Sequence, residues 1–126
     1  MDVAALLVTQ ETEVLDEAYA ALERSHVAHY EAAGESFTRR GLSDLFHLVV
    51  ASIGDRDLAE MSVYAEKVAE QRFGQGFDIS EVQMAFNALE EAMWRRVVAG
   101  TPPNELAEAV GLLSTVLGFG KDALAR

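Results

Sequence analysis

The chain has 126 residues, half of them apolar, and 21 acidic against 10 basic residues give it a formal net charge of −11. This size and composition predict one folded domain over residues 1–126, and the absence of cysteine excludes a disulfide framework or a thiolate nucleophile. The negative charge excludes nucleic acid and anionic membrane surfaces as partners, since basic doublets occur only at Arg39-Arg40 and Arg95-Arg96.

Apolar residues recur every three or four positions along most of the chain, which predicts helices and no strand. A first helix is expected over Val3 to Ala33. Gly34 ends it, and residues 34–41, rich in small and polar side chains, form the expected loop. The inward stripe of this helix consists of Leu15, Tyr19, Leu22, His26 and His29.

A second helix is expected over about residues 42–53, and its nearly all-round apolar surface predicts a central position. Gly54 ends it. Asp57 then caps a third helix, with Glu60 at the capping-box position. The inward residues of this third helix are Leu58, Met61, Ala65 and Val68.

The junction at residues 71–82 combines the signals for the end of one helix and the start of the next. Gly74 and Gly76 can adopt the left-handed conformation that closes a helix. Asp78 is an N-cap with Glu81 three positions on, which is the pattern of a capping box. A helical hairpin is therefore predicted.

The fourth helix, over about residues 79–99, has the clearest stripe and ends at Gly100. Thr101 is the expected cap of the fifth helix, with Pro102 at its first position. Short connections predict that successive helices pack as near-antiparallel neighbours. The inward stripe of the fourth helix is Ile79, Val82, Phe86, Leu89, Met93 and Val97; that of the fifth is Leu106, Val110, Leu113 and Leu117.

Two features of the last helices indicate contact surfaces. The fifth helix has a row of small side chains, which is typical of tight helix packing but also of a dimer interface or of space for an apolar ligand. Trp94 lies off the main stripe of the fourth helix, so it either shelters the core or forms a second contact surface. The small row consists of Ala107, Gly111, Ser114 and Gly118.

The histidines are the only residues that suggest cofactor chemistry. Glu23 and His26 have the spacing of a di-iron ligand pair, but such sites need a second pair and further inward glutamates. Neither His26 nor His29 has the late position of a globin's iron ligand. We therefore interpret both as locally hydrogen-bonded, with a pH-sensitive or ligand-contacting pair as the alternative. No nucleophile with its base and no phosphate loop is evident, so an enzyme is not expected.

The chain resembles the N-terminal domains of RsbR-type stressosome proteins, the RsbT co-antagonist N-terminal domains. The resemblance is carried by YAEKVAEQRFGQGFDISEVQ at residues 64–83 and AFNALEEA at residues 85–92, and less specifically by His29-Tyr30 and Gly34. It implies a non-haem, globin-like helical domain that dimerises and acts as a sensory or regulatory input ahead of an output domain, often a STAS domain. It implies no catalytic residues.

We therefore expect an all-α, globin-like bundle of about five helices that forms a homodimer and works as a non-enzymatic regulatory module without a cofactor. A signalling protein or an apolar small ligand is the expected partner, acting by helix repacking. The alternative is a small-molecule or haem-binding protein with His26 or His29 as ligand. No apolar run spans a bilayer and no basic signal-peptide region is present, so a cytoplasmic location is expected. The candidate site residues are His26, His29, Phe86, Met93, Trp94, Gly111, Ser114 and Gly118.

Overall fold

A computed structural model describes residues 2–125 and shows seven α-helices and no strand over that range. The helices are α1 (Val3–Thr9), α2 (Glu11–Ser25), α3 (Ala28–Ala33), α4 (Glu35–Asp55), α5 (Ala59–Gly74), α6 (Ile79–Gly100) and α7 (Leu106–Leu124). The predicted all-α class is confirmed. Among the described residues, no helix combines the length and the apolar character needed to cross a membrane.

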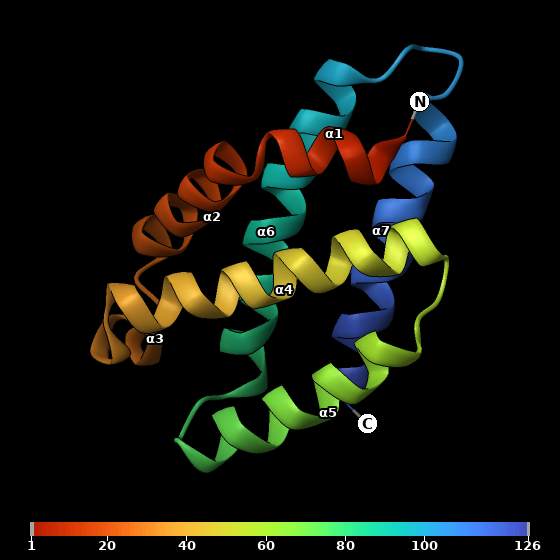
Figure 1. The fold of residues 1–126 in the computed structure, drawn as a ribbon. Helices are drawn as coiled ribbons and strands as arrows, with labels where there is room; N and C mark the ends of the chain where they lie inside the picture. The colour runs from red at the N-terminus through yellow and green to blue at the C-terminus, as the bar shows by residue number, and fades with distance from the viewer. Residues whose placement is uncertain (1, 126) are drawn as a thin grey trace.

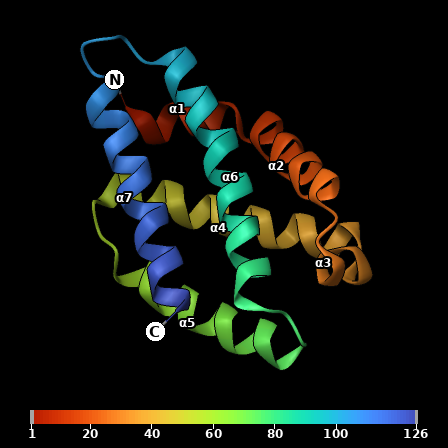
Figure 2. The same ribbon diagram turned by 180° about the vertical axis from the view of Figure 1, so that it is seen from behind.

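Helix α4 is central, as its apolar sequence predicted, and it contacts every other helix. Figure 1 shows α4 crossing in front of α6 and α7, with α1 above and α5 below. Figure 2, from behind, shows α6 and α7 side by side and antiparallel. The helices thus form crossed layers, so the prediction that all successive helices are antiparallel neighbours holds for α6 and α7 but is wrong for the chain as a whole.

The core lies where these layers meet. Burying one large apolar side chain stabilises the fold by roughly 1.5–3 kcal/mol relative to leaving it exposed. The largest fully buried side chains are Phe46, Phe86, Leu7, Leu45, Met61, Leu89, Met93, Leu113 and Leu117. They come from α1, α4, α5, α6 and α7, so most of the helices depend on one shared interior.

Small residues set how closely the helices approach. Ala88 and Ala92 of α6 and Ala18 of α2 are all buried, and α2 and α6 contact one another extensively. Gly120 of α7 marks a tighter contact: a Cβ there would lie 2.9 Å from the Met61 sulfur and 2.9 Å from a Phe86 ring carbon. A side chain at position 120 would therefore push α7 away from α5 and α6.

Gly120→Ala is expected to lower the free energy of unfolding by about 1–2 kcal/mol. Overpacking costs about 1–3 kcal/mol, and the better helix propensity of alanine returns at most about 1 kcal/mol. Gly54→Ala is the matched control, because a Cβ at Gly54 meets only the Ala4 methyl at an ordinary 3.8 Å. Urea unfolding of both variants measures the difference; equal stability of the two would contradict the close approach at Gly120.

The single helix predicted over residues 3–33 is wrong, because it consists of α1, α2 and α3. The break between α2 and α3 falls at His26, whose backbone is left-handed with φ +50°. Tertiary packing explains the breaks: α1 lies against α4 and α6, whereas α2 follows α6 with Val14 and Leu22 buried. One straight helix could not bury both segments. The end of the predicted helix at Ala33 is confirmed, with Gly34 following at φ +95°.

The predicted loop over residues 34–41 is also wrong, since α4 begins at Glu35. The Thr38 side chain is buried and its hydroxyl donates to the Gly34 carbonyl at 2.9 Å, while Phe37 packs against the core. These contacts override the loop-like composition of the segment.

The predicted start of the last helix needs a similar correction. α7 begins at Leu106, and the Glu105 N–H instead closes a turn onto the Pro102 carbonyl at 2.9 Å. Thr101 is buried and its hydroxyl has no hydrogen-bond partner in the part of the chain described, so it is not the cap. The reason is Pro103, which disfavours helical backbone at the preceding residue.

Candidate functional site

The α5–α6 junction confirms the capping signals read from the sequence. Gly76, with φ +93°, reverses the chain after α5. The Asp78 carboxylate accepts from the Ser80 N–H at 3.1 Å, and Glu81 accepts from the Asp78 N–H at 3.0 Å, completing the capping box. Gly74, by contrast, remains helical as the last residue of α5.

Glu81 also joins α6 to α3 through His29. Its carboxylate accepts from the His29 backbone N–H at 3.2 Å and lies 2.8 Å from the His29 ring Nδ1. The pKa of Glu81 lies below its usual 4.5, mainly because the carboxylate accepts from the Asp78 N–H. The two His29 contacts also lower this pKa, whereas partial burial raises it. One carboxylate therefore caps α6 and anchors the first turn of α3.

Because the pKa of Glu81 is lowered in the folded state, the ionised carboxylate contributes its stability above about pH 4.5 and loses it as pH falls through the lowered pKa. Glu81→Gln is expected to cost about 1 kcal/mol at pH 7, and this difference from the unmodified chain should shrink below pH 4.5. Urea unfolding between pH 3 and pH 7 measures it. The exposed Glu66→Gln serves as control, and a pH-independent effect at Glu81 would contradict this role.

Arg72, at the end of α5, is buried although its guanidinium has no carboxylate within ion-pair distance in the described chain. The guanidinium carbon lies 4.3 Å from the centroid of the Phe37 ring and 5.8 Å from that of Phe77. Its Nη1 donates to the Gln71 side-chain oxygen at 3.1 Å. Aromatic faces thus replace the missing counter-ion.

Two further residues complete the surroundings of Arg72. Burial raises the pKa of the Tyr30 hydroxyl, and the Arg72 guanidinium opposes that rise. Gly41 of α4 gives it room, because a Cβ there would lie 3.3 Å from the Arg72 Nη2. Arg72 therefore connects α3, α4 and the α5–α6 junction. Sequence analysis noted this arginine only as part of the family motif.

Hydrogen bonds between α6 and α7 show which exposed residues lie beside the contact between these two helices. Lys121 Nζ donates to Asn87 Oδ1 at 3.0 Å and to Glu90 Oε1 at 2.8 Å. Trp94 lies two helical turns beyond Asn87, and Ser114 two turns before Lys121, so both flank the same seam between the antiparallel helices. Trp94 and the small-residue row, predicted as separate features, therefore share one surface.

We call this surface the outer face. All its members are exposed except Gly118, which is half-buried, and a Cβ at Gly111 or Gly118 would meet nothing within 4 Å. The outer face consists of Met84, Asn87, Glu91, Trp94 and Val98 of α6 and Ala107, Gly111, Ser114 and Gly118 of α7. The small row thus faces outward rather than into the intramolecular packing that the sequence favoured.

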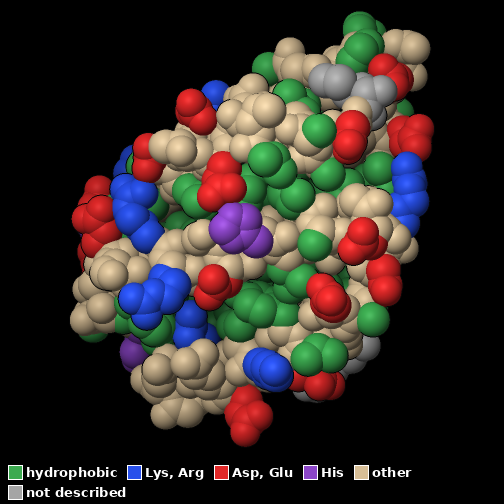
Figure 3. Space-filling view, in the orientation of Figure 1, with side chains coloured by type: hydrophobic (Ala, Val, Ile, Leu, Met, Phe, Trp, Pro, Cys, Tyr) green, Lys and Arg blue, Asp and Glu red, His purple; other side chains and the backbone are tan. Residues whose placement is uncertain are grey.

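The outer face is apolar and locally neutral. Three of the six most exposed large apolar side chains of the described residues lie on it: Met84, Trp94 and Val98. Its ionic groups are balanced, since Lys121 pairs with Glu90 and Arg95 pairs with Glu91 at 2.6 Å. Figure 3 shows the opposite side of the molecule, where charged side chains interrupt the apolar surface.

The other candidate residues are dispersed. Phe86 and Met93 are fully buried in the core, 2% and 0% exposed. The His26 side chain is 78% exposed, and its Nδ1 lies 3.1 Å from the Glu31 carboxylate. The His29 Nδ1 lies 2.8 Å from the Glu81 carboxylate. Neither histidine faces α7, so the structure does not bring them together with Trp94.

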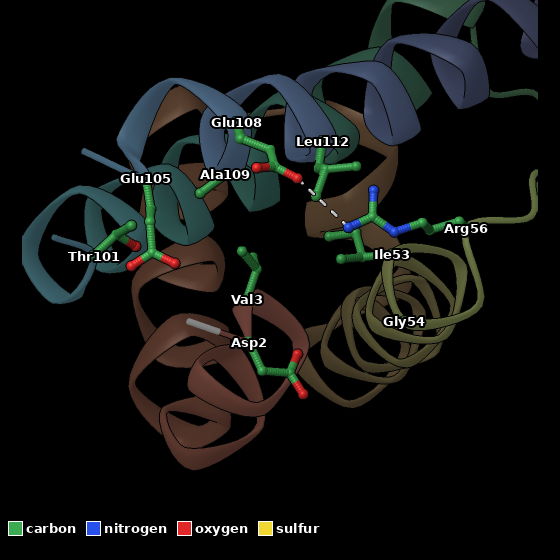
Figure 4. Close-up of a pocket in the computed structure, with 10 residues that line it drawn as sticks. All are labelled: Asp2, Val3, Ile53, Gly54, Arg56, Thr101, Glu105, Glu108, Ala109 and Leu112. Carbon is green, nitrogen blue, oxygen red and sulfur yellow. Dashed lines mark ion pairs between the residues drawn. The ribbon is translucent and has the colours of Figure 1, made fainter. Parts of the chain in front are cut away.

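Four cavities of about 250–330 Å³ occur among residues 2–125, and neither His26 nor His29 lines any of these four. Figure 4 shows one of about 330 Å³, where Asp2, Glu105 and Glu108 lie around Val3, and Arg56 points toward Glu108 from one edge. The described residues contain no group of three or more histidine or acidic side chains arranged for a metal ion. The alternative of a haem-binding protein with His26 or His29 as ligand stays a prediction.

In the comparison with known families, the model of the RsbT co-antagonist protein rsbRD N-terminal domain matches residues 3–123. Neither the curated proteins nor the solved structures contain a match. The family resemblance read from residues 64–92 is thus confirmed, whereas the globin-like arrangement stays a prediction.

Proposed function

Since this chain belongs to the RsbT co-antagonist RsbRD N-terminal domain family, which comprises stressosome-type regulatory domains, we propose that it is a non-enzymatic regulatory module that works as a homodimer. The outer face is the proposed dimer interface. The observation that carries the proposal is the presence of both a protruding Trp94 and an open row of small residues on this one face.

The outer face is complementary to itself. In a two-fold symmetric interface the same surface meets its copy, so each protomer must present both halves of every contact. The Trp94 side chain, 44% exposed, supplies bulk. The open space over Gly111 and Gly118 supplies room. In the proposed dimer, Trp94 of each protomer fills the space over the small row of the other.

Charge supports the choice of this face. Two chains of net charge −11 repel one another, so they associate best where the local charge is smallest. On and beside the outer face, Glu91 is paired with Arg95 and Glu90 with Lys121. The exposed apolar side chains of α5, Val63 and Phe73, lie instead on a helix with several exposed glutamates, including Glu60, Glu66 and Glu70.

Regulation in this proposal is a change in how α6 and α7 pack. A signalling partner, or a small apolar ligand, shifts the equilibrium if it binds one arrangement of the two helices better than another. The junction held by Arg72 and Glu81 sets the entry angle of α6, so it is the structural support for this motion. The chain acts, on this view, as a cytoplasmic input to a stressosome-type assembly.

Trp94→Ala is expected to weaken the dimer by about 2 kcal/mol or more, which is roughly a thirty-fold higher dissociation constant, because a buried tryptophan at the centre of an interface dominates its energy. Sedimentation equilibrium measures the dissociation constant. Trp94 is the only tryptophan, so its emission should also shift to longer wavelength on dilution of the unmodified chain. Val63→Ala, on α5, is the matched control and should leave association unchanged.

A second variant separates dimerisation from folding. A Cβ at Gly118 meets no atom within 4 Å, so the side chain of Gly118→Leu should enter the open space and dissociate the dimer while leaving the free energy of unfolding equal or higher. Dimers of undiminished affinity in both Trp94→Ala and Gly118→Leu would rule out the outer face as the interface.

A further inference from the structure

An apolar cavity of about 270 Å³ lies between the end of α4, the start of α5 and α7. Its volume is below the range of roughly 300–1,000 Å³ typical of sites for drug-sized molecules, so it suits a smaller ligand. Its lining is mainly apolar and consists of Ile53, Leu58, Gly111, Leu112, Thr115 and Val116, together with Ser52, Arg56 and Glu108.

Two opposite charges stand side by side in the lining. The Arg56 Nη2 lies 3.6 Å from the Glu108 Oε1, which is too long for a hydrogen bond, and the two side chains are 65% and 71% exposed. Figure 4 shows the two groups pointing toward one another, with Ile53 and Leu112 beside them. Arg56 and Glu108 therefore keep most of their hydrogen-bonding capacity beside an apolar surface.

Arg56 is the C-cap of α4, and its left-handed backbone, φ +53°, ends that helix beside the cavity. One local feature distinguishes this site from an ordinary surface ion pair. The Ser52 side chain is only 4% exposed, and its hydroxyl has no hydrogen-bond partner in the described residues. A buried hydroxyl without a partner is unfavourable unless a ligand or solvent satisfies it.

We propose that this cavity binds a free α-amino acid with an apolar side chain, such as leucine. The carboxylate of the ligand accepts two hydrogen bonds from Arg56, its ammonium group donates to Glu108, and its side chain lies between Ile53, Leu112 and Val116. An anion alone would face Glu108 and the negative chain, and an amine alone would face Arg56. A zwitterion matches both charges and adds no net charge.

Gly111 borders both this cavity and the outer face, but the proposal does not rest on the proposed function, because one protomer supplies every ligand contact. The test is titration of ¹⁵N-labelled protein with L-leucine, followed through the amide resonances of Ser52 and Gly111. The comparison compounds are 3-methylbutylamine, which lacks the carboxylate, and 4-methylpentanoate, which lacks the ammonium group. L-leucine is expected to bind at least about ten-fold tighter than either, since each lacks one charge-assisted contact.

Two variants test which group of the ligand each charged side chain binds. Arg56→Gln should weaken L-leucine at least about ten-fold but leave 3-methylbutylamine equal or tighter, because it removes the charge that repels the amine. Glu108→Gln should likewise weaken L-leucine but leave 4-methylpentanoate equal or tighter. Arg40→Gln, at an exposed arginine outside the cavity, is the matched control. Equal affinity for all three compounds, or no saturable shift at millimolar L-leucine, overturns the proposal. Circular dichroism checks that each variant is folded.

Discussion

Helix α6 is the element on which the rest of the structure depends, because it is held on three sides and free on the fourth. Alanines such as Ala88 let α2 approach on one side, Phe86 enters the core, and Lys121 joins α6 to α7. Its start is fixed by Glu81, which also anchors α3. The remaining side, with Trp94, is the surface that this packing leaves to a partner.

Sequence reasoning succeeded where the signal is local. The Asp78–Glu81 capping box spans four residues, and backbone preference alone determines it. Prediction from the sequence failed where packing against distant residues determines the local structure. Residues 34–41 have the composition of a loop, yet burial of Thr38 makes them helical. The surroundings of Arg72 include Phe37 and Gly41, more than thirty positions away, so no local pattern could have indicated them.

The candidate site, like the fold, was only partly predictable from the sequence. Helical periodicity revealed the small-residue row and placed Trp94 off the main stripe, but it could not show that both flank one seam. That relation follows from the tertiary contacts of Lys121 with Asn87 and Glu90. Periodicity also placed His26 and His29 on one inward stripe, and the left-handed backbone at His26 interrupts that stripe. The same burial pattern that sends Met93 inward leaves Trp94 outside.

The central claim is that two copies meet through the outer face of α6 and α7. Cross-saturation NMR on a mixture of deuterated, ¹⁵N-labelled chains and unlabelled chains identifies the amides at an interface directly. The account predicts that intensity losses cluster at residues 84–98 of α6 and 107–118 of α7. Losses clustered on α5 instead, around Val63 and Phe73, would contradict it.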